Sequence, residues 1–181
     1  MAYIFDIIYL EGDCMEVKII LGNIVDLDCD AIVNAANKEL RGGSGVCGAI
    51  FKSAGWEELQ KECYEKGPIK TGEAAITKGY NLKAKYIIHA VGPIYSHHDT
   101  EDNMRLLSDA YFNSLKLADS YNLKSIAYPS ISTGVYGFPK KEACSIATYT
   151  VRTYEAKSLE EVIFVCFDKE TYDLYNEFMN K

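Results

Sequence analysis

The residues best suited to chemistry lie in a glycine-rich stretch, AIVNAANKELRGGSGVCGAIFKSAG, which begins at residue 31. An apolar run leads into Asn34 and Asn37, then into glycines that include Gly45, and then into an amphipathic pattern. The order of strand, glycine loop and helix is typical of phosphate binding, because N–H groups at the start of a helix point at the anion. An ordinary tight turn between a strand and a helix is the alternative.

A second stretch, SIAYPSISTGVYGFPKKEACSI, repeats this order from residue 125. Its loop residues are Ser130, Ser132, Thr133, Gly134, Val135, Tyr136 and Gly137, and Pro139 then opens the next helix. Ligands of open α/β sheets bind beyond the carboxyl ends of strands, so two such loops would grip a diphosphate from both sides. Tyr136 lies between two glycines and is expected to pack against a sugar ring or form a pocket wall. A surface aromatic is the alternative.

The two asparagines suggest a further contact. Asn34 and Asn37 stand three residues apart at the end of the expected strand. An amide side chain both donates and accepts hydrogen bonds, which suits sugar hydroxyls. Capping of the loop is the alternative interpretation.

Apolar runs of strand length alternate with amphipathic stretches and predict an α/β fold. Strands are expected over residues 15–20, 31–36, 74–79, 86–91, 125–130 and 162–167, and helices over 45–55, 56–67, 103–122, 139–156 and 169–181. Several of the strands are almost continuously apolar, as in a sheet covered on both faces. The expected architecture is therefore a three-layer α/β/α sandwich.

Length and composition fit one compact domain. The chain has 181 residues, of which 48% are hydrophobic. We assign residues 15–181 to the domain and residues 1–14 to an N-terminal extension, which is either an added edge strand or a marginally ordered segment. The net charge of −7 opposes binding to DNA.

The cysteines and histidines point to a protein of the cytoplasm without a metal. Six cysteines without CxxC spacing are expected to be reduced thiols, and no apolar run reaches the roughly 20 residues that span a membrane. His97 and His98 adjoin each other in a polar loop, but no further ligand completes a metal site. We expect no metal and no other cofactor.

Three motifs, IVNAANKELRGGSGVCGAI, TGEAAITKGYNLKAKYIIHAVGP and ISTGVYGFP, carry a resemblance to a known family. From about Glu16 to the C-terminus the sequence closely resembles macro domains, in particular the MacroD-type bacterial O-acetyl-ADP-ribose deacetylases. The resemblance implies a central mixed sheet with ADP-ribose in a cleft at the strand ends. It also implies a hydrolase that removes acyl or protein groups from ADP-ribose, with O-acetyl-ADP-ribose or mono-ADP-ribosylated proteins as substrates.

The resemblance also implies roles for individual residues. Adenine is expected to meet Asn23 and Ile24 and to stack on Phe167, for which a core position is the alternative. The distal ribose is expected at Asn37 and Tyr136. The remaining ligand-binding residues, most of them around the phosphates, are expected to be Asn34, Gly45, Val46, Ser132, Thr133, Gly134, Val135 and Gly137.

Three positions depart from the family pattern. Asn23 replaces the aspartate that accepts a hydrogen bond from the adenine amino group. Because a neutral hydrogen bond contributes about 0.5–1.5 kcal/mol against about 1.5–3 for a charged one, we expect weaker selectivity for adenine. Cys47 replaces the aspartate credited with activating water, and Phe51 replaces a common histidine.

Cys47 leaves two interpretations open, with Asn37, Cys47 and Tyr136 as the candidate catalytic residues. Loss of a general base costs about 10²- to 10⁴-fold in rate. Cys47 is then either a small residue of the pocket wall, with the ligand's phosphate positioning the water, or a thiolate activated at a helix N-terminus. A binding module without catalysis and a regulator of a ribonuclease are the alternative functions.

Overall fold

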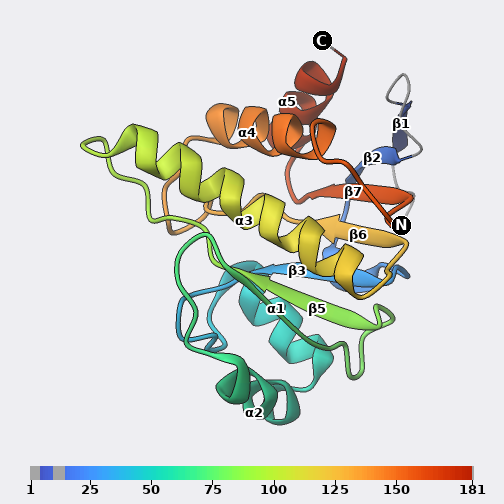
Figure 1. Ribbon diagram of the computed structural model, residues 1–181, viewed down its shortest axis with the longest axis vertical. Coiled ribbons are helices and arrows are strands. Elements are labelled where there is room, and N and C mark those ends of the chain that lie inside the picture. The colour runs from blue at the N-terminus through green and yellow to red at the C-terminus, as the bar shows by residue number, and fades with distance from the viewer. Residues whose placement is uncertain (1–4, 10–14, 181) are drawn as a thin grey trace.

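The fold is a sheet covered by helices on both faces. The computed structural model describes residues 5–9 and 15–180. Figure 1 shows α3, α4 and α5 on one side of the sheet and α1 and α2 on the other. The predicted three-layer α/β/α sandwich is confirmed.

The sheet has seven strands in the order β1-β2-β7-β6-β3-β5-β4. The five inner strands, β2, β7, β6, β3 and β5, run parallel, and β1 and β4 pair antiparallel at the two edges. The sheet is therefore mixed, as the resemblance implied. The strands are β1 (Phe5–Tyr9), β2 (Glu16–Leu21), β3 (Ala31–Ala35), β4 (Ala74–Lys78), β5 (Tyr86–Ala90), β6 (Ser125–Tyr128) and β7 (Glu161–Cys166).

Five α-helices and one 3-10 turn connect and cover these strands. They are η1 (Ile24–Asp26), α1 (Gly45–Ala54), α2 (Trp56–Lys66), α3 (Thr100–Ser120), α4 (Lys140–Arg152) and α5 (Lys169–Met179). Every strand and helix expected from the sequence is present. Among the described helices, none combines the length and the apolar character needed to cross a bilayer.

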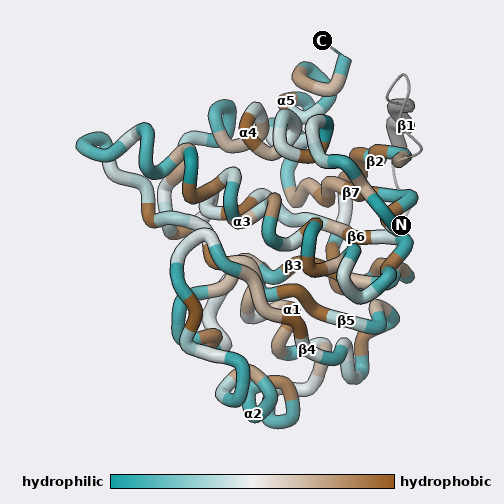
Figure 2. Tube along the Cα trace, viewed as in Figure 1, coloured by the Kyte–Doolittle hydropathy of each residue, from teal (hydrophilic) through white to brown (hydrophobic). Residues whose placement is uncertain are grey.

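The hydrophobic core has two parts, one on each face of the sheet, and the side chains of a strand contribute to them alternately. On β3, Ala31 and Val33 pack under α3, α4 and α5, whereas Ile32 packs under α1 and α2. Because successive side chains of a strand point to opposite faces, one short apolar strand supplies both cores. Figure 2 shows hydrophobic residues along β5 and α1 and mostly hydrophilic ones on the outer helix α2.

The N-terminal strand extends the sheet by one edge. β1 pairs with β2 in the register Phe5↔Ile20 to Tyr9↔Glu16. Of the two alternatives for this segment, the structure shows the added edge strand. The division of the chain into an extension and a domain at residue 15 stays a prediction.

Candidate functional site

Loops after two neighbouring strands enclose a cavity of about 410 Å³. β3 and β6 pair in parallel, so their carboxyl ends open at the same edge of the sheet. The cavity is lined by Ala35, Ala36, Asn37, Gly43, Ser44, Gly45, Val46, Cys47, Gly92, Ser130, Ile131, Ser132, Gly134, Val135 and Tyr136. The structure therefore brings together the two glycine loops that the sequence singled out.

The first loop ends at the N-terminus of α1. Gly45 has a φ of 60°, a conformation that glycine adopts without strain, and it opens the helix beside the cavity. Gly48 lies close to the loop, since a Cβ on it would stand 2.5 Å from the carbonyl oxygen of Gly43. The start of α1, with its N–H groups and the positive end of its dipole, is thereby held against the cavity.

Asn37 fixes the shape of this loop. Its Nδ2 donates to the carbonyl of Arg41 at 2.8 Å, and its Oδ1 accepts from the N–H of Arg41 at 3.0 Å. Asn37 also lines the cavity and is half-buried. The structure thus shows the loop-capping role for Asn37, and its contact with a ribose stays a prediction.

The second loop is held by its own backbone. The N–H of Phe138 donates to the carbonyl of Ser132 at 2.9 Å, and the N–H of Gly137 donates to that of Gly134 at 2.9 Å. Ser132 has a φ of 65°, and its buried Oγ finds no hydrogen-bond partner among the described residues. Ser132 lines the cavity, but its hydroxyl has almost no accessible surface and lies close against Gly92.

Tyr136 forms part of the cavity wall and is half-buried. Its carbonyl accepts a hydrogen bond from the N–H of Tyr95 at 2.8 Å. Burial, followed by the nearby Glu39 and Cys47, raises the pKa of the Tyr136 hydroxyl. The hydroxyl therefore stays protonated at neutral pH and can donate to a ligand.

Cys47 lies in the first turns of α1 with 6% of its surface exposed. Its sulfur accepts from Asn34 Nδ2 at 3.6 Å and donates to the carbonyl of Arg41 at 3.8 Å. Burial raises the pKa of the thiol, and the hydrogen bonds from Asn34 and Gly43 offset only part of that effect. Burial therefore outweighs these two hydrogen bonds and favours the neutral thiol, and the choice between pocket wall and thiolate stays a prediction.

Behind Cys47 runs a polar chain that sequence analysis did not find. Asn34 Nδ2 lies 3.0 Å from Nδ1 of His89, and His89 Nε2 lies 2.9 Å from Oγ1 of Thr77. Burial lowers the pKa of His89 to about 3, so the ring is neutral. The signal was a histidine in the apolar run YIIHAV, where a buried polar side chain needs a partner. That partner, Asn34, is its register neighbour on β3.

Six expected ligand residues lie outside the cavity, and four of them are Asn34, Ile24, Thr133 and Gly137. Asn34 is fully buried and does not line the cavity, because its amide contacts Cys47 on α1 and His89 on β5. Ile24 is 3% exposed and packs in the core beneath α1 and α2. Thr133 and Gly137 belong to the second loop but not to its cavity-lining part. The Thr133 hydroxyl donates to the carbonyl of Ser130 at 3.0 Å.

Asn23 and Phe167 extend the same edge of the sheet beyond the cavity. The N–H of Gly22 donates to the carbonyl of Cys166 at 2.9 Å, so the two residues directly follow a paired end of β2 and β7. Phe167 is 91% exposed, which rules out the core position. Asn23 is exposed and caps η1 by accepting from the N–H of Val25.

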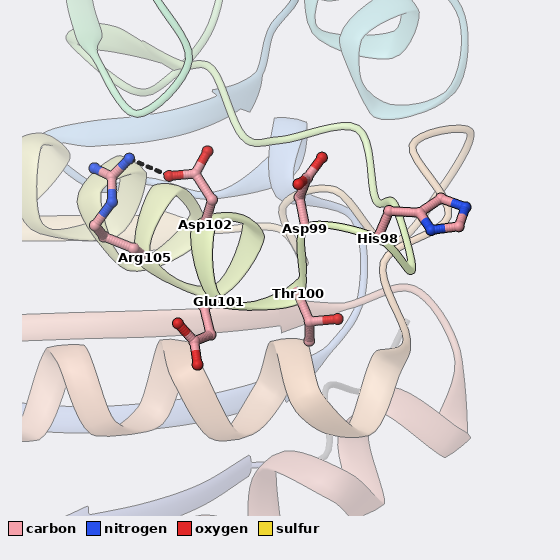
Figure 3. A pocket seen from close by; sticks show the side chains of 6 residues that line it. All are labelled: His98, Asp99, Thr100, Glu101, Asp102 and Arg105. Carbon is pink, nitrogen blue, oxygen red and sulfur yellow. Dashed lines mark hydrogen bonds and ion pairs between the residues drawn. The ribbon is translucent and has the colours of Figure 1, made fainter.

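A larger hollow, of about 610 Å³, lies at the start of α3. Its lining residues are His98, Asp99, Thr100, Glu101, Asp102 and Arg105. Figure 3 shows these side chains pointing in different directions, with Arg105 paired to Asp102. Among the described residues, no group of three histidine, cysteine or acidic side chains is placed to hold a metal. We therefore base the function on the cavity between the loops.

Comparison with known proteins identifies the class to which this sheet and its two loops belong. The macro domain family model matches residues 33–147. The chain is 53% identical over 167 residues to a macro domain-containing protein of Caldanaerobacter subterraneus, covering 90% of this chain and 94% of that protein. The chain belongs to the macro domain family.

Another relative and two solved structures are similar along most of the chain. An O-acetyl-ADP-ribose deacetylase of Escherichia fergusonii is 47% identical over 171 residues, covering 91% of this chain and 96% of that protein. A variant of the Oceanobacillus iheyensis macrodomain with ADP-ribose superposes with a TM-score of 0.90 at 37% identity, covering 99% and 97%. A Trypanosoma brucei macrodomain in complex with ADP-ribose superposes with a TM-score of 0.83 at 37% identity, covering 92% of this chain and 71% of that chain.

Proposed function

We propose that this chain binds ADP-ribose in the cavity between the two loops and slowly hydrolyses acyl or protein esters of ADP-ribose. The observation that carries the proposal is the placement of the α1 N-terminus and the loop after β6 on opposite sides of one cavity. Backbone N–H groups at the start of a helix and in a glycine-containing loop suit a diphosphate. Solved relatives that hold ADP-ribose support the proposal.

The hydrolysis itself is the addition of water to the ester. Water attacks the acyl carbon, the bond from that carbon to the ribose oxygen breaks, and free ADP-ribose and a carboxylic acid leave. A relative named O-acetyl-ADP-ribose deacetylase supports this reaction. Because Cys47 is a buried thiol, we assign the positioning of the water to the ligand's phosphate and Cys47 to the wall of the cavity.

A binding module that does not turn its ligand over is the second candidate. One observation favours it: among the described residues that line the cavity, there is no carboxylate to act as a general base.

Product release distinguishes the two candidates. The protein is incubated with O-acetyl-ADP-ribose and, separately, with a mono-ADP-ribosylated protein, and free ADP-ribose is followed by chromatography. Release above the uncatalysed background, inhibited by excess ADP-ribose, is expected. Binding of ADP-ribose by calorimetry without release from either substrate would leave the binding module as the function.

Calorimetry with shorter ligands tests the orientation in the cavity. We expect ADP-ribose to bind more tightly than ADP, because Asn37 and Tyr136 line the part of the cavity assigned to the distal ribose. Equal affinities for ADP and ADP-ribose would contradict that assignment.

A further inference from the structure

The outer helix α2 holds the first loop of the cavity through one side chain. Gln60 Oε1 accepts a hydrogen bond from the N–H of Gly42 at 2.8 Å, and Gln60 Nε2 donates to the carbonyl of Leu40 at 3.2 Å. These two backbone partners fix the orientation of the amide, because turning it over would oppose two donors and two acceptors. Gln60 therefore holds the loop on both sides of Arg41, whose backbone Asn37 holds as well.

The conformation of this loop needs such support. Leu40 has a φ of 53°, a left-handed conformation that is unfavourable for leucine and persists only where surrounding contacts enforce it. Gly42 and Gly43 follow, and glycine restricts the backbone less than any other residue. A Cβ on Gly43 would meet, among the described residues, only Sγ of Cys47, at 3.9 Å. Without an anchor, this segment would sample many conformations.

A second contact from α2 fixes the loop at the same glycine. A Cβ on Gly42 would clash with the indole ring of Trp56 and would lie 2.9 Å from Cδ1 of Phe51. The rings of Trp56 and Phe51 pack with their centroids 5.2 Å apart. The backbone at Gly42 therefore lies directly against this aromatic pair, which a side chain at this position would prevent.

The held segment leads directly into the cavity. Gly43, Ser44 and Gly45 follow Gly42 and line the cavity, and Gly45 opens α1. Gln60 does not line the cavity, so any effect on a ligand acts through the loop. Because the loop is ordered before a ligand binds, less conformational entropy is lost on binding.

We infer that Gln60 is a positioning residue for diphosphate binding, which holds the first loop so that residues 43–45 face the ligand. This inference rests on the proposed function, in which the start of α1 binds the diphosphate. It adds a residue of the outer helix layer to the machinery of the cavity.

Three proteins test the inference: the wild type, Gln60→Met and the matched control Glu62→Met. Methionine resembles glutamine in length and in helix propensity, but it donates no hydrogen bond and accepts only weakly. Glu62 is also half-buried on α2, and it accepts from the N–H of Lys78 at 3.1 Å and from the hydroxyl of Tyr80 at 2.7 Å. Glu62→Met therefore removes two hydrogen bonds of the same helix that do not involve the loop, and the charge it removes is negative, which gives no reason for weaker binding of an anion.

Calorimetry with ADP-ribose and with ADP measures the effect on the ligand. Gln60→Met is expected to bind each of them about tenfold more weakly than the wild type, because both carry the diphosphate and two hydrogen bonds that order the loop are lost. Glu62→Met is expected to stay within about twofold of the wild type. An unchanged affinity in Gln60→Met, a loss for ADP-ribose alone, or an equal loss in Glu62→Met overturns the inference and leaves the proposed function in place. A wild type that binds neither nucleotide overturns the proposed function and the inference with it.

Amide hydrogen exchange in the ligand-free proteins measures the loop itself. The N–H of Gly42 is expected to exchange at least about tenfold faster in Gln60→Met than in the wild type, since its acceptor is gone, and to keep the wild-type rate in Glu62→Met. Amides of β3 that stay protected show that each variant is folded. An N–H of Gly42 that stays protected in Gln60→Met would show that the loop keeps its position without Gln60 and would overturn the inference.

Discussion

Cys47 combines two surroundings that act on its thiol in opposite ways. The N–H groups of Asn34 and Gly43 favour the thiolate, and burial disfavours it more strongly, so the pKa is raised. A carboxylate at this position would receive the same two hydrogen bonds. Under the proposed hydrolysis, we expect these hydrogen bonds to orient a carboxylate introduced at this position as a general base.

Substitution of Cys47 tests this description. We expect Cys47→Asp to raise the rate of release from O-acetyl-ADP-ribose by at least about a hundredfold, within the range typical of a general base. Cys47→Ala should stay within a few-fold of the wild type, because a wall residue contributes no proton transfer. Initial rates at saturating substrate measure both.

The opposite pattern would assign a reactive thiol. A Cys47→Ala variant that has lost at least about a hundredfold in rate, together with a Cys47→Asp variant no faster than wild type, would contradict the wall assignment. Alkylation that stops turnover and is prevented by bound ADP-ribose would do the same.

For individual residues, the sequence predicted those that line the cavity better than the buried polar residues behind them. Gly45, Ser132 and Tyr136 could be predicted because loop glycines and polar residues after strands have a local signature. The pairing of Asn34 with His89 could not, since the two residues are 55 positions apart and meet only through the register of β3 and β5.

The contact between α1 and the loop before it depends on a glycine. Alanine usually stabilises a helix relative to glycine by about 1 kcal/mol, but a Cβ at Gly48 would lie 2.5 Å from the carbonyl of Gly43. We therefore expect Gly48→Ala to lower the free energy of unfolding by about 1–3 kcal/mol, as overpacking does, and to weaken ADP-ribose binding. Urea denaturation and calorimetry measure the two effects.

Gly134→Ala is the matched control for stability. A Cβ there would meet no described atom within 4 Å. Its free energy of unfolding should stay within about 0.5 kcal/mol of the wild type. Similar losses in the two variants would mean that crowding against Gly43 is not the cause.

A buried carboxylate connects the end of α3 with the segment between α4 and β7. Asp119 accepts from Tyr154 at 2.7 Å and from the N–H groups of Ser158 and Leu159 at 2.8 and 3.0 Å. Burial alone would raise its pKa, but these hydrogen bonds and that of Lys157 outweigh burial and lower the pKa to about 2. The ionised carboxylate therefore stabilises the fold.

Asp119→Asn should lower the free energy of unfolding by about 2 kcal/mol at neutral pH. A lowered pKa contributes stability above the unfolded value of 3.8 and loses it as the pH falls toward about 2. The difference between wild type and variant should therefore shrink below about pH 4. Urea denaturation at a series of pH values measures it, and a difference that stays constant down to about pH 2 would contradict the assignment.

Element boundaries were less predictable than the elements themselves. α3 begins at Thr100, earlier than the expected residue 103, because its first turn is polar and carries no apolar period. β6 stops at Tyr128 instead of residue 130, because Pro129 has no N–H to donate to a neighbouring strand. α4 ends at Arg152 instead of residue 156, and the segment that follows donates backbone hydrogen bonds to Asp119.

The net charge of the whole molecule limits which groups can bind the diphosphate of ADP-ribose. The chain carries a net charge of −7, and the described residues that line the cavity include no lysine or arginine. Local dipoles of backbone N–H groups must therefore outweigh the overall negative field.

Binding of ADP-ribose should accordingly depend little on salt. Between about 0.05 and 0.5 M salt we expect the affinity to change by less than about threefold, because fixed dipoles at contact distance are screened far less than exposed charges. Calorimetry across ionic strength is the measurement. A loss of affinity of about tenfold or more over that range would show that exposed cations hold the phosphates.

The two loops of the cavity follow strands that are neighbours in space but distant in the chain. The N–H of Asp30, the residue before β3, donates to Oγ of Ser125, the first residue of β6, which lies 95 residues further along the chain. A ligand that contacts both loops therefore links the early and the late part of the chain through reversible, non-covalent contacts. Bound ADP-ribose should slow the separation of β3 from β6 at the centre of the sheet. We therefore expect the ligand to protect the protein against proteolysis and thermal unfolding.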